Sequence, residues 1–312
     1  MNIFRKNRMP AVLAFVLLIG AGCAGQQTTL EPWELPDKTG MRDNTPVCLV
    51  PEMSGTDVRE NELARIDCSN APEGYVFVQY LGKNEKVKLQ ITGSDTVTYT
   101  YTIHAGDAPD VFPLSSGDGT YQIGVYENIQ LNQYALAFAT ELDVRLHDAF
   151  LPFLYPNQYV KFEAGDEAIA LGRTLAAPAD DDLEVVSNVY NYVIRNISYD
   201  TQEAETVTSG YLPDIDEVLE TKKGICLDYA ALMTAILRSQ KIPTRMEVGY
   251  AGIAYHAWIS VHIDGVGWVN GLIEFDGTSW SLMDPTFAAS TAADELKTYI
   301  GEGDNYETKY VY

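Results

Sequence analysis

The spacing of apolar residues changes near residue 150, and this change constrains the fold more than any other feature. Before that point, five runs alternate apolar or β-branched residues with polar ones, at 74–81, 86–92, 96–104, 119–128 and 134–146. Turn signals such as Gly93-Ser94-Asp95 and Gly117-Asp118-Gly119 separate these runs. Short strands at this spacing are typical of two packed antiparallel sheets. We therefore expect a small Ig-like β-sandwich over residues 46–150.

Beyond residue 150 the spacing becomes helical. In one segment the apolar residues recur every three or four positions, at Leu183, Val186, Val189, Tyr190, Val193 and Ile197. The acidic run 180–182 precedes this segment, where it can cap the helix and favour its start through the helix dipole. A second series of strands begins at Arg245. Helices followed by a strand meander predict an α+β domain over residues 151–312, with helices packed on an antiparallel sheet.

The first 22 residues have the layout of a secretory signal peptide. Arg5, Lys6 and Arg8 precede a short apolar run that ends in small residues before Cys23. This layout resembles a bacterial lipobox, although Gly20 stands where the usual pattern prefers Leu. The resemblance implies that Cys23 carries lipid and that the protein is anchored on the outer face of a bacterial cell membrane. The residues that follow Cys23 are polar, contain proline and glycine and show no period, so we expect residues 23–45 to be a lipidated tether. The alternative is a plain secretory signal in which Cys23 has no role.

Acidic residues dominate the remainder of the chain. The leader holds three of the 21 basic residues and no acidic one, so 18 basic residues face 44 acidic ones and the formal net charge is −26. Nucleic-acid binding needs a basic surface, so this charge argues against it. No later segment has 18 consecutive apolar residues, and we expect no membrane-spanning helix after processing.

Four cysteines are present, and one of them has no evident partner. If Cys23 carries lipid, Cys48 and Cys68 can form a disulfide in an oxidising compartment. Cys226 is then left over, and an odd thiol in an exported protein is paired, buried or used chemically.

Cys226 stands between a glycine and a helical pattern. Leu227, Ala230, Ala231 and Thr234 recur at helical spacing, which places Cys226 at or near a helix N-terminus. The amides and dipole of a helix N-terminus stabilise a thiolate. An inert core cysteine is the alternative interpretation.

Two later residues could serve as the base and the orienting residue for the Cys226 thiol. His256 lies in an alternating run, on the half-exposed face of a predicted strand, and Asp264-Gly265 indicates a hairpin. After a second turn at Asp276-Gly277, another strand reaches Asp284 just before a proline. Neighbouring strands can bring Asp284 to one nitrogen of His256 while the other nitrogen faces the sulfur. Asp284 as a simple turn residue is the alternative.

Metal and cofactor chemistry has no sequence signature in this chain. His256 and His262 share a strand face but are six positions apart, about 20 Å along a strand, so one ion cannot bridge them. We expect no metal and no cofactor.

Three segments together resemble the transglutaminase-like superfamily, relatives of the papain-type thiol enzymes. They are "KKGICLDYAALMTAILRSQKIPTRMEVGY", "YHAWISVHID" and "LMDPTF", within residues 165 to 290. The resemblance implies that Cys226 is the nucleophile, His256 the general base and acid, and Asp284 the orienting residue. It also implies attack on an amide carbonyl and a thioester intermediate. The Cys226 amide is expected to be one oxyanion donor, with Tyr199 and Tyr211 as candidates for the second.

Three functions fit these residues. The first is an extracytoplasmic peptidase or amidase that acts on a peptide or protein, such as a cell-wall or surface protein. The second is a transamidase that cross-links glutamine to an amine, and the third is a non-catalytic module that binds peptide or glycan. The intact Cys-His-Asp set favours an enzyme over the binding module.

Overall fold

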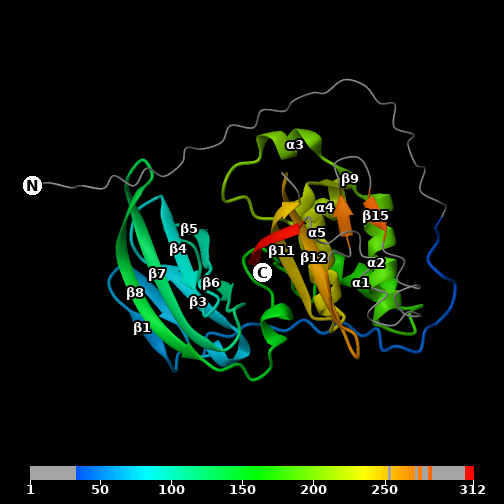
Figure 1. Cartoon of the computed structure of the whole chain (residues 1–312), viewed down its shortest axis with the longest axis horizontal. Coiled ribbons are helices and arrows are strands. Elements are labelled where there is room, and N and C mark those ends of the chain that lie inside the picture. Colours follow the sequence, from blue (N-terminus) through cyan, green and yellow to red (C-terminus); the bar gives the residue numbers. More distant parts are fainter. Residues whose placement is uncertain (1–32, 252–253, 271–272, 276–279, 283–305) are drawn as a thin grey trace, which may run out of the picture. The chain divides into compact units, whose positions relative to one another are not determined.

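The computed structural model describes residues 33–251, 254–270, 273–275, 280–282 and 306–312, and residues Trp33–Tyr312 form one compact unit. Strands occupy the chain up to Val144, and the first α-helix begins at Glu167 (Figure 1). In the part of the chain that the structure describes, no helix combines the length and apolarity needed to cross a membrane.

Two four-stranded antiparallel sheets make up the β-rich N-terminal part. The first has the order β1-β2-β3-β6, with β1 Val58–Glu60, β2 Ala64–Asp67, β3 Tyr75–Tyr80 and β6 Asp110–Pro113. The second has the order β5-β4-β7-β8, with β5 Thr98–Ile103, β4 Val87–Thr92, β7 Gly119–Gln130 and β8 Gln133–Val144. The rings of Tyr101 and Phe112, one from each sheet, lie 4.8 Å apart in a shared core. All five predicted strands are present, and β1, β2 and β6 were not predicted because they are too short for a clear alternation.

The C-terminal part combines five helices with a four-stranded antiparallel sheet among the described residues. The helices are α1 Glu167–Ala176, α2 Asp182–Asn196, α3 Thr201–Thr206, α4 Ile215–Thr221 and α5 Cys226–Ser239. The sheet has the order β13-β12-β11-β16, with β13 Gly267–Asn270, β12 Ala254–Ile263, β11 Thr244–Ala251 and β16 Tyr306–Val311. Two small sheets pair β9 Ser198–Tyr199 with β10 Lys223–Gly224, and β14 Ile273–Phe275 with β15 Trp280–Leu282. This is the predicted α+β architecture.

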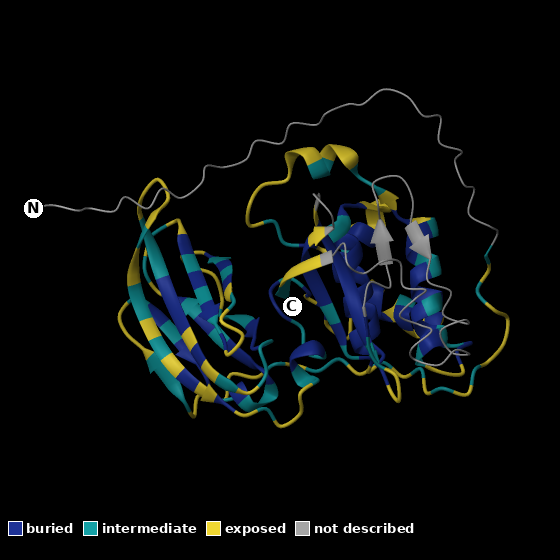
Figure 2. Ribbon diagram, viewed as in Figure 1, coloured by how far each residue is buried: buried dark blue, intermediate teal, exposed yellow. Residues whose placement is uncertain are grey.

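Helix α5 is the central helix of this part. It packs against α1 and α2 on one side and against β11 and β12 on the other. Every residue from Asp228 to Ser239 is consequently buried, as the dark blue helix in Figure 2 shows. The sequence predicts only one apolar side for this helix. The difference arises because buried polar side chains such as Arg238 bond to backbone carbonyls, here those of Tyr155 and Thr244.

The C-terminal strand β16 completes the sheet beside β11. Thr308 of β16 donates a hydrogen bond to the Glu247 carboxylate at 2.7 Å, and Ser260 and Trp258 of β12 donate to the same group at 2.6 and 3.2 Å. His256 lies on the same face of β12 as Trp258 and Ser260, and only 9% of it is exposed. The prediction that His256 lies on a half-exposed strand face is therefore wrong.

Residues 33–47, which we name the docked N-terminal segment, lie against the helices. The sequence assigns residues 23–45 to a free tether because they are polar and rich in proline and glycine, and the structure differs from residue 33 onward. The segment is held by contacts that include Lys38 Nζ to Asp180 (2.7 Å), Arg42 Nε to Asp182 (2.5 Å) and the Val47 N–H to the Ser239 carbonyl (2.7 Å). Its basic side chains find acidic partners about 140 positions away, which local composition does not reveal.

Candidate active site

The nucleophile candidate Cys226 is the first residue of α5, as predicted. Gly224 of β10, two residues earlier, pairs with Tyr199 of β9. A Cβ on Gly224 would lie 2.8 Å from the Asp228 Cβ, which is closer than real Cβ contacts allow. The glycine therefore lets the chain turn tightly against the first turn of α5. This turn presents the Cys226 side chain at the positive end of the helix dipole.

Asp228 lies one turn into α5 and is completely buried. One carboxylate oxygen accepts the Ile225 N–H at 2.8 Å, and the other accepts the Tyr211 hydroxyl at 2.8 Å. Burial raises the pKa of Asp228 to about 6, and these two hydrogen bonds oppose that shift. Sequence reasoning missed this residue, although an acidic side chain at the third helical position is a known capping signal.

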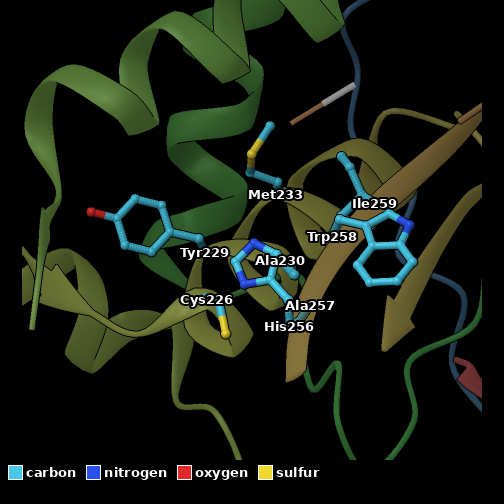
Figure 3. Close-up of a pocket in the computed structure, with 8 residues that line it drawn as sticks. All are labelled: Cys226, Tyr229, Ala230, Met233, His256, Ala257, Trp258 and Ile259. Atoms are coloured by element: carbon cyan, nitrogen blue, oxygen red, sulfur yellow. The ribbon is translucent and has the colours of Figure 1, made fainter. Parts of the chain in front are cut away.

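His256 lies on β12, opposite Gly249 of β11. Its side chain is buried, and burial lowers the pKa of the imidazole to about 4. Cys226 and His256 line the same pocket, and Figure 3 shows the sulfur and the imidazole ring among its lining residues. The other side chains of this pocket are mainly apolar and include Tyr229, Ala230, Met233, Trp258 and Ile259. The structure therefore brings two of the three predicted catalytic residues together.

Burial and hydrogen bonding shift the pKa of the Cys226 thiol in opposite directions. Burial is the largest influence and raises the pKa of the thiol, and the nearby Asp228 charge raises it further. The backbone N–H groups of Ala257 and Leu227 lower it. Because burial also lowers the pKa of His256, the resting pair favours a neutral thiol and a neutral imidazole.

Two tyrosines were candidates for the second oxyanion donor, and the structure separates them. The Tyr211 hydroxyl is bonded to Asp228. The pKa of Tyr199 is raised to about 12 by burial and by the neighbouring Cys226 and Asp228, while the Cys226 backbone N–H acts on the same phenol in the opposite direction. The Tyr199 hydroxyl thus lies beside the amide expected to bind an oxyanion.

Two further predicted site residues cannot be compared with this pocket. Asp284 and Cys23 lie outside the described residues, as does the predicted turn at 276–277. Within the described residues, no group of three His, Cys, Asp or Glu side chains is placed to hold a metal ion.

The predicted Cys48–Cys68 disulfide is not formed in the structure, where both residues are free thiols. Cys48 follows the docked N-terminal segment and is near Asp166, whereas Cys68 lies in the sandwich core near Arg59 and Asp57. The docking of residues 33–47 on the helices gives Cys48 surroundings that the sequence spacing does not predict.

A comparison with protein families identifies the C-terminal part. Residues 169–271 match the family model described as the transglutaminase-like superfamily. The matched segment contains Cys226 and His256 together with the helix and strand that carry them. The match confirms the resemblance to this superfamily for the two segments that carry Cys226 and His256, whereas the third segment, "LMDPTF", lies beyond residue 271.

Individual relatives are more distant. The UPF0252 protein MJ1282 of Methanocaldococcus jannaschii is 29% identical over 129 residues, which cover 38% of this chain and only 35% of that protein. A solved structure from Cytophaga hutchinsonii, named a "putative cysteine protease", is 16% identical with a TM-score of 0.34, and the match covers 60% of this chain and 71% of that chain. Red sea bream transglutaminase is 13% identical with a TM-score of 0.23, covering 68% of this chain and 48% of that chain. The family assignment rests on the sequence match and not on these structural likenesses.

Proposed function

We propose that the protein is an exported, lipid-anchored thiol enzyme that hydrolyses amide bonds in peptides or proteins. One observation carries the proposal: Cys226 at the start of α5 and His256 on β12 line one pocket, although they are distant in the chain. The match to the transglutaminase-like superfamily supports it. A binding module would not need a base beside a sulfur.

The proposed reaction uses the chain's own groups in two stages. His256 takes the proton of Cys226 as the sulfur attacks the amide carbonyl carbon, and the carbonyl oxygen becomes negatively charged. The Cys226 N–H and the Tyr199 hydroxyl donate hydrogen bonds to that oxygen. His256 then gives its proton to the departing amine, which leaves a thioester. Water attacks the thioester with His256 as base, the acid is released and the thiol is restored. Asp284 orients the imidazole throughout.

The test uses p-nitrophenyl acetate, which acylates an activated thiol whatever the natural substrate is. We expect a burst of p-nitrophenolate and an acetyl group on Cys226 by mass spectrometry of the quenched protein. Cys226→Ala should abolish both, whereas the matched control Cys48→Ala should retain them. An undiminished burst in Cys226→Ala would eliminate the proposed nucleophile.

The base is tested by a second pair of variants on the same strand. His256→Ala should slow acylation by about 10²- to 10⁴-fold, the usual contribution of general acid–base catalysis. His262→Ala is the matched control, because His262 packs against Phe150 and Trp268 instead of lining the Cys226 pocket. Equal losses in the two variants would contradict the role of His256.

The role of Asp284 is tested against Asp264, whose side chain is fully exposed in the hairpin after β12. Asp284→Asn should lower the acylation rate, and Asp264→Asn should leave it unchanged. Full activity in Asp284→Asn would remove this residue from the proposed triad.

Hydrolysis and transamidation differ in the molecule that reaches the thioester. Incubation with casein and monodansylcadaverine distinguishes them, because transamidation attaches the fluorescent amine to casein and hydrolysis produces peptides or free acid. We expect hydrolysis. Amine attachment would assign the protein to the transamidases instead.

The anchor is tested separately. Expression in bacteria fed labelled palmitate should label the wild-type chain and Cys48→Ala but not Cys23→Ala, and only the labelled forms should sediment with membranes. Unlabelled wild-type protein in the culture medium would indicate a plain secretory signal.

A further inference from the structure

Asp228 is an acidic residue that takes no direct part in the proposed reaction, and its burial is unusual for a charged group. Its side chain is completely buried, and its two oxygens accept hydrogen bonds from Ile225 and Tyr211. A buried carboxylate requires hydrogen-bond partners, so these two bonds fix its position. It lies two residues after Cys226 and packs against Gly224, so it contacts both sides of the nucleophile's turn.

Tyr211 connects Asp228 to an exposed part of the chain, residues 200–213, which we name the α3 segment. Helix α3 within this segment has no buried residue. Asp200 caps the helix by accepting the Glu203 N–H at 2.9 Å, so that bond lies within the segment itself. The bond from Tyr211 to Asp228 instead joins the segment to α5. Few buried contacts make such a segment easy to open locally.

We propose that Asp228 is a positioning residue for the reaction: its carboxylate fixes the turn before Cys226, anchors the α3 segment beside the active site, and keeps the sulfur protonated until His256 removes the proton. This inference rests on the proposed function for its catalytic meaning. A negative charge near a thiolate disfavours it, and the effect is strong where both groups are shielded from water.

Several ionisable groups from the surrounding elements face Asp228. They are Tyr211 and Glu203 of the α3 segment, Glu217 of α4, Tyr199 of β9, and Cys226 and Tyr229 of α5. None of these groups is basic. Hydrogen bonds and the helix N-terminus therefore stabilise the carboxylate charge, and its electrostatic influence on Cys226 is not cancelled by a cation among them.

The test measures how the reactivity of the Cys226 thiol depends on pH and does not require catalytic activity. Iodoacetamide labelling of the Cys226 peptide is followed by mass spectrometry across pH for Asp228→Asn, which preserves size and removes the charge. The labelling midpoint should fall by about one pH unit, the lower end of the usual effect of a close charge. A purely structural residue would change stability without moving this midpoint.

The matched control is Asp200→Asn, which removes a charge from the α3 segment while leaving a good helix cap. Its midpoint should stay at the wild-type value. An unmoved midpoint in Asp228→Asn, or an equal fall in both variants, would overturn the electrostatic role. If the wild-type protein gives no acetyl burst but Asp228→Asn still lowers the labelling midpoint, the proposed function is contradicted and the electrostatic role of Asp228 is not.

Anchoring is measured by hydrogen exchange in Tyr211→Phe, which also serves if Asp228→Asn does not fold. Backbone amides of the α3 segment should exchange several-fold faster than in wild type. Tyr192→Phe is the control, because the Tyr192 hydroxyl contacts Lys222 outside the segment. Unchanged exchange in Tyr211→Phe would refute the anchoring role.

Discussion

Glu247 should be among the most sensitive positions in the C-terminal sheet. Its carboxylate is buried and accepts three hydrogen bonds. One oxygen accepts from Ser260, and the other accepts from both Trp258 and Thr308. Glu247→Ala removes the shared acceptor of β12 and β16. A buried donor that loses its acceptor costs about 1–3 kcal/mol, so the loss of three should lower the free energy of unfolding by about 3–9 kcal/mol.

Glu247→Gln provides a sharper test, because the amide keeps one oxygen and replaces the other with a donor. The retained oxygen can still accept from Trp258 and Thr308, and the Ser260 hydroxyl can rotate to accept from the new amide. We therefore expect a loss of only about 1 kcal/mol. Glu307→Ala on the exposed side of β16 is the control, with a change within about 0.5 kcal/mol.

Urea denaturation followed by tryptophan fluorescence measures these changes, and Trp258 reports from within the cluster. If Glu247→Ala lies within about 1 kcal/mol of wild type, the three bonds contribute little. If Glu247→Gln is as unstable as Glu247→Ala, the charge matters more than the hydrogen-bond pattern. Either result would refute the reasoning.

Three further predictions concern the active site. Gly249→Ala should destabilise the sheet by about 1–3 kcal/mol or more, because its Cβ would lie 2.1 Å from the Glu307 carbonyl; faster hydrogen exchange in β16 is the measurement. Folding lowers the pKa of His256 from 6.5 to about 4. Above pH 6.5 the imidazole is neutral in both states and the free energy of unfolding is unaffected. As pH falls from 6.5 toward 4, only the unfolded chain gains the proton, so the free energy of unfolding decreases. Wild type should therefore lose about 2 kcal/mol more than His256→Gln between pH 7 and 5 in urea titrations. Tyr199→Phe should slow acylation about 10²-fold if its hydroxyl binds the oxyanion, with Tyr192→Phe unchanged; equal rates in the two variants would exclude that role.

Local sequence patterns predicted the elements that carry Cys226 and His256. The glycine before Cys226 and the helical spacing after it located the start of α5, and alternation located β12. Asp181 caps α2 by accepting the Glu184 N–H, as the acidic run at 180–182 suggested. These features depend on neighbours within a few residues, which a single sequence displays directly.

Features that depend on distant contacts were not predictable in the same way. Asp228 is bonded to Tyr211, 17 positions earlier, and His256 is buried in a pocket that residues of α5 also line. The docked N-terminal segment depends on ion pairs with α2 and its cap region. In each case the local composition was compatible with exposure, and tertiary packing decided otherwise.

The docked N-terminal segment would also limit how far the proposed enzyme could act from the proposed lipid anchor. If Cys23 is lipidated, only the nine residues 24–32, or ten Cα–Cα steps, lie between the anchored residue and Trp33. A fully extended chain of that length spans about 35 Å, less than the diameter of about 50 Å expected for a folded chain of this size. The catalytic domain would then operate in a layer about one protein thick above the lipid surface. Its substrates would be molecules that enter this layer, selected by proximity before any contact with the pocket.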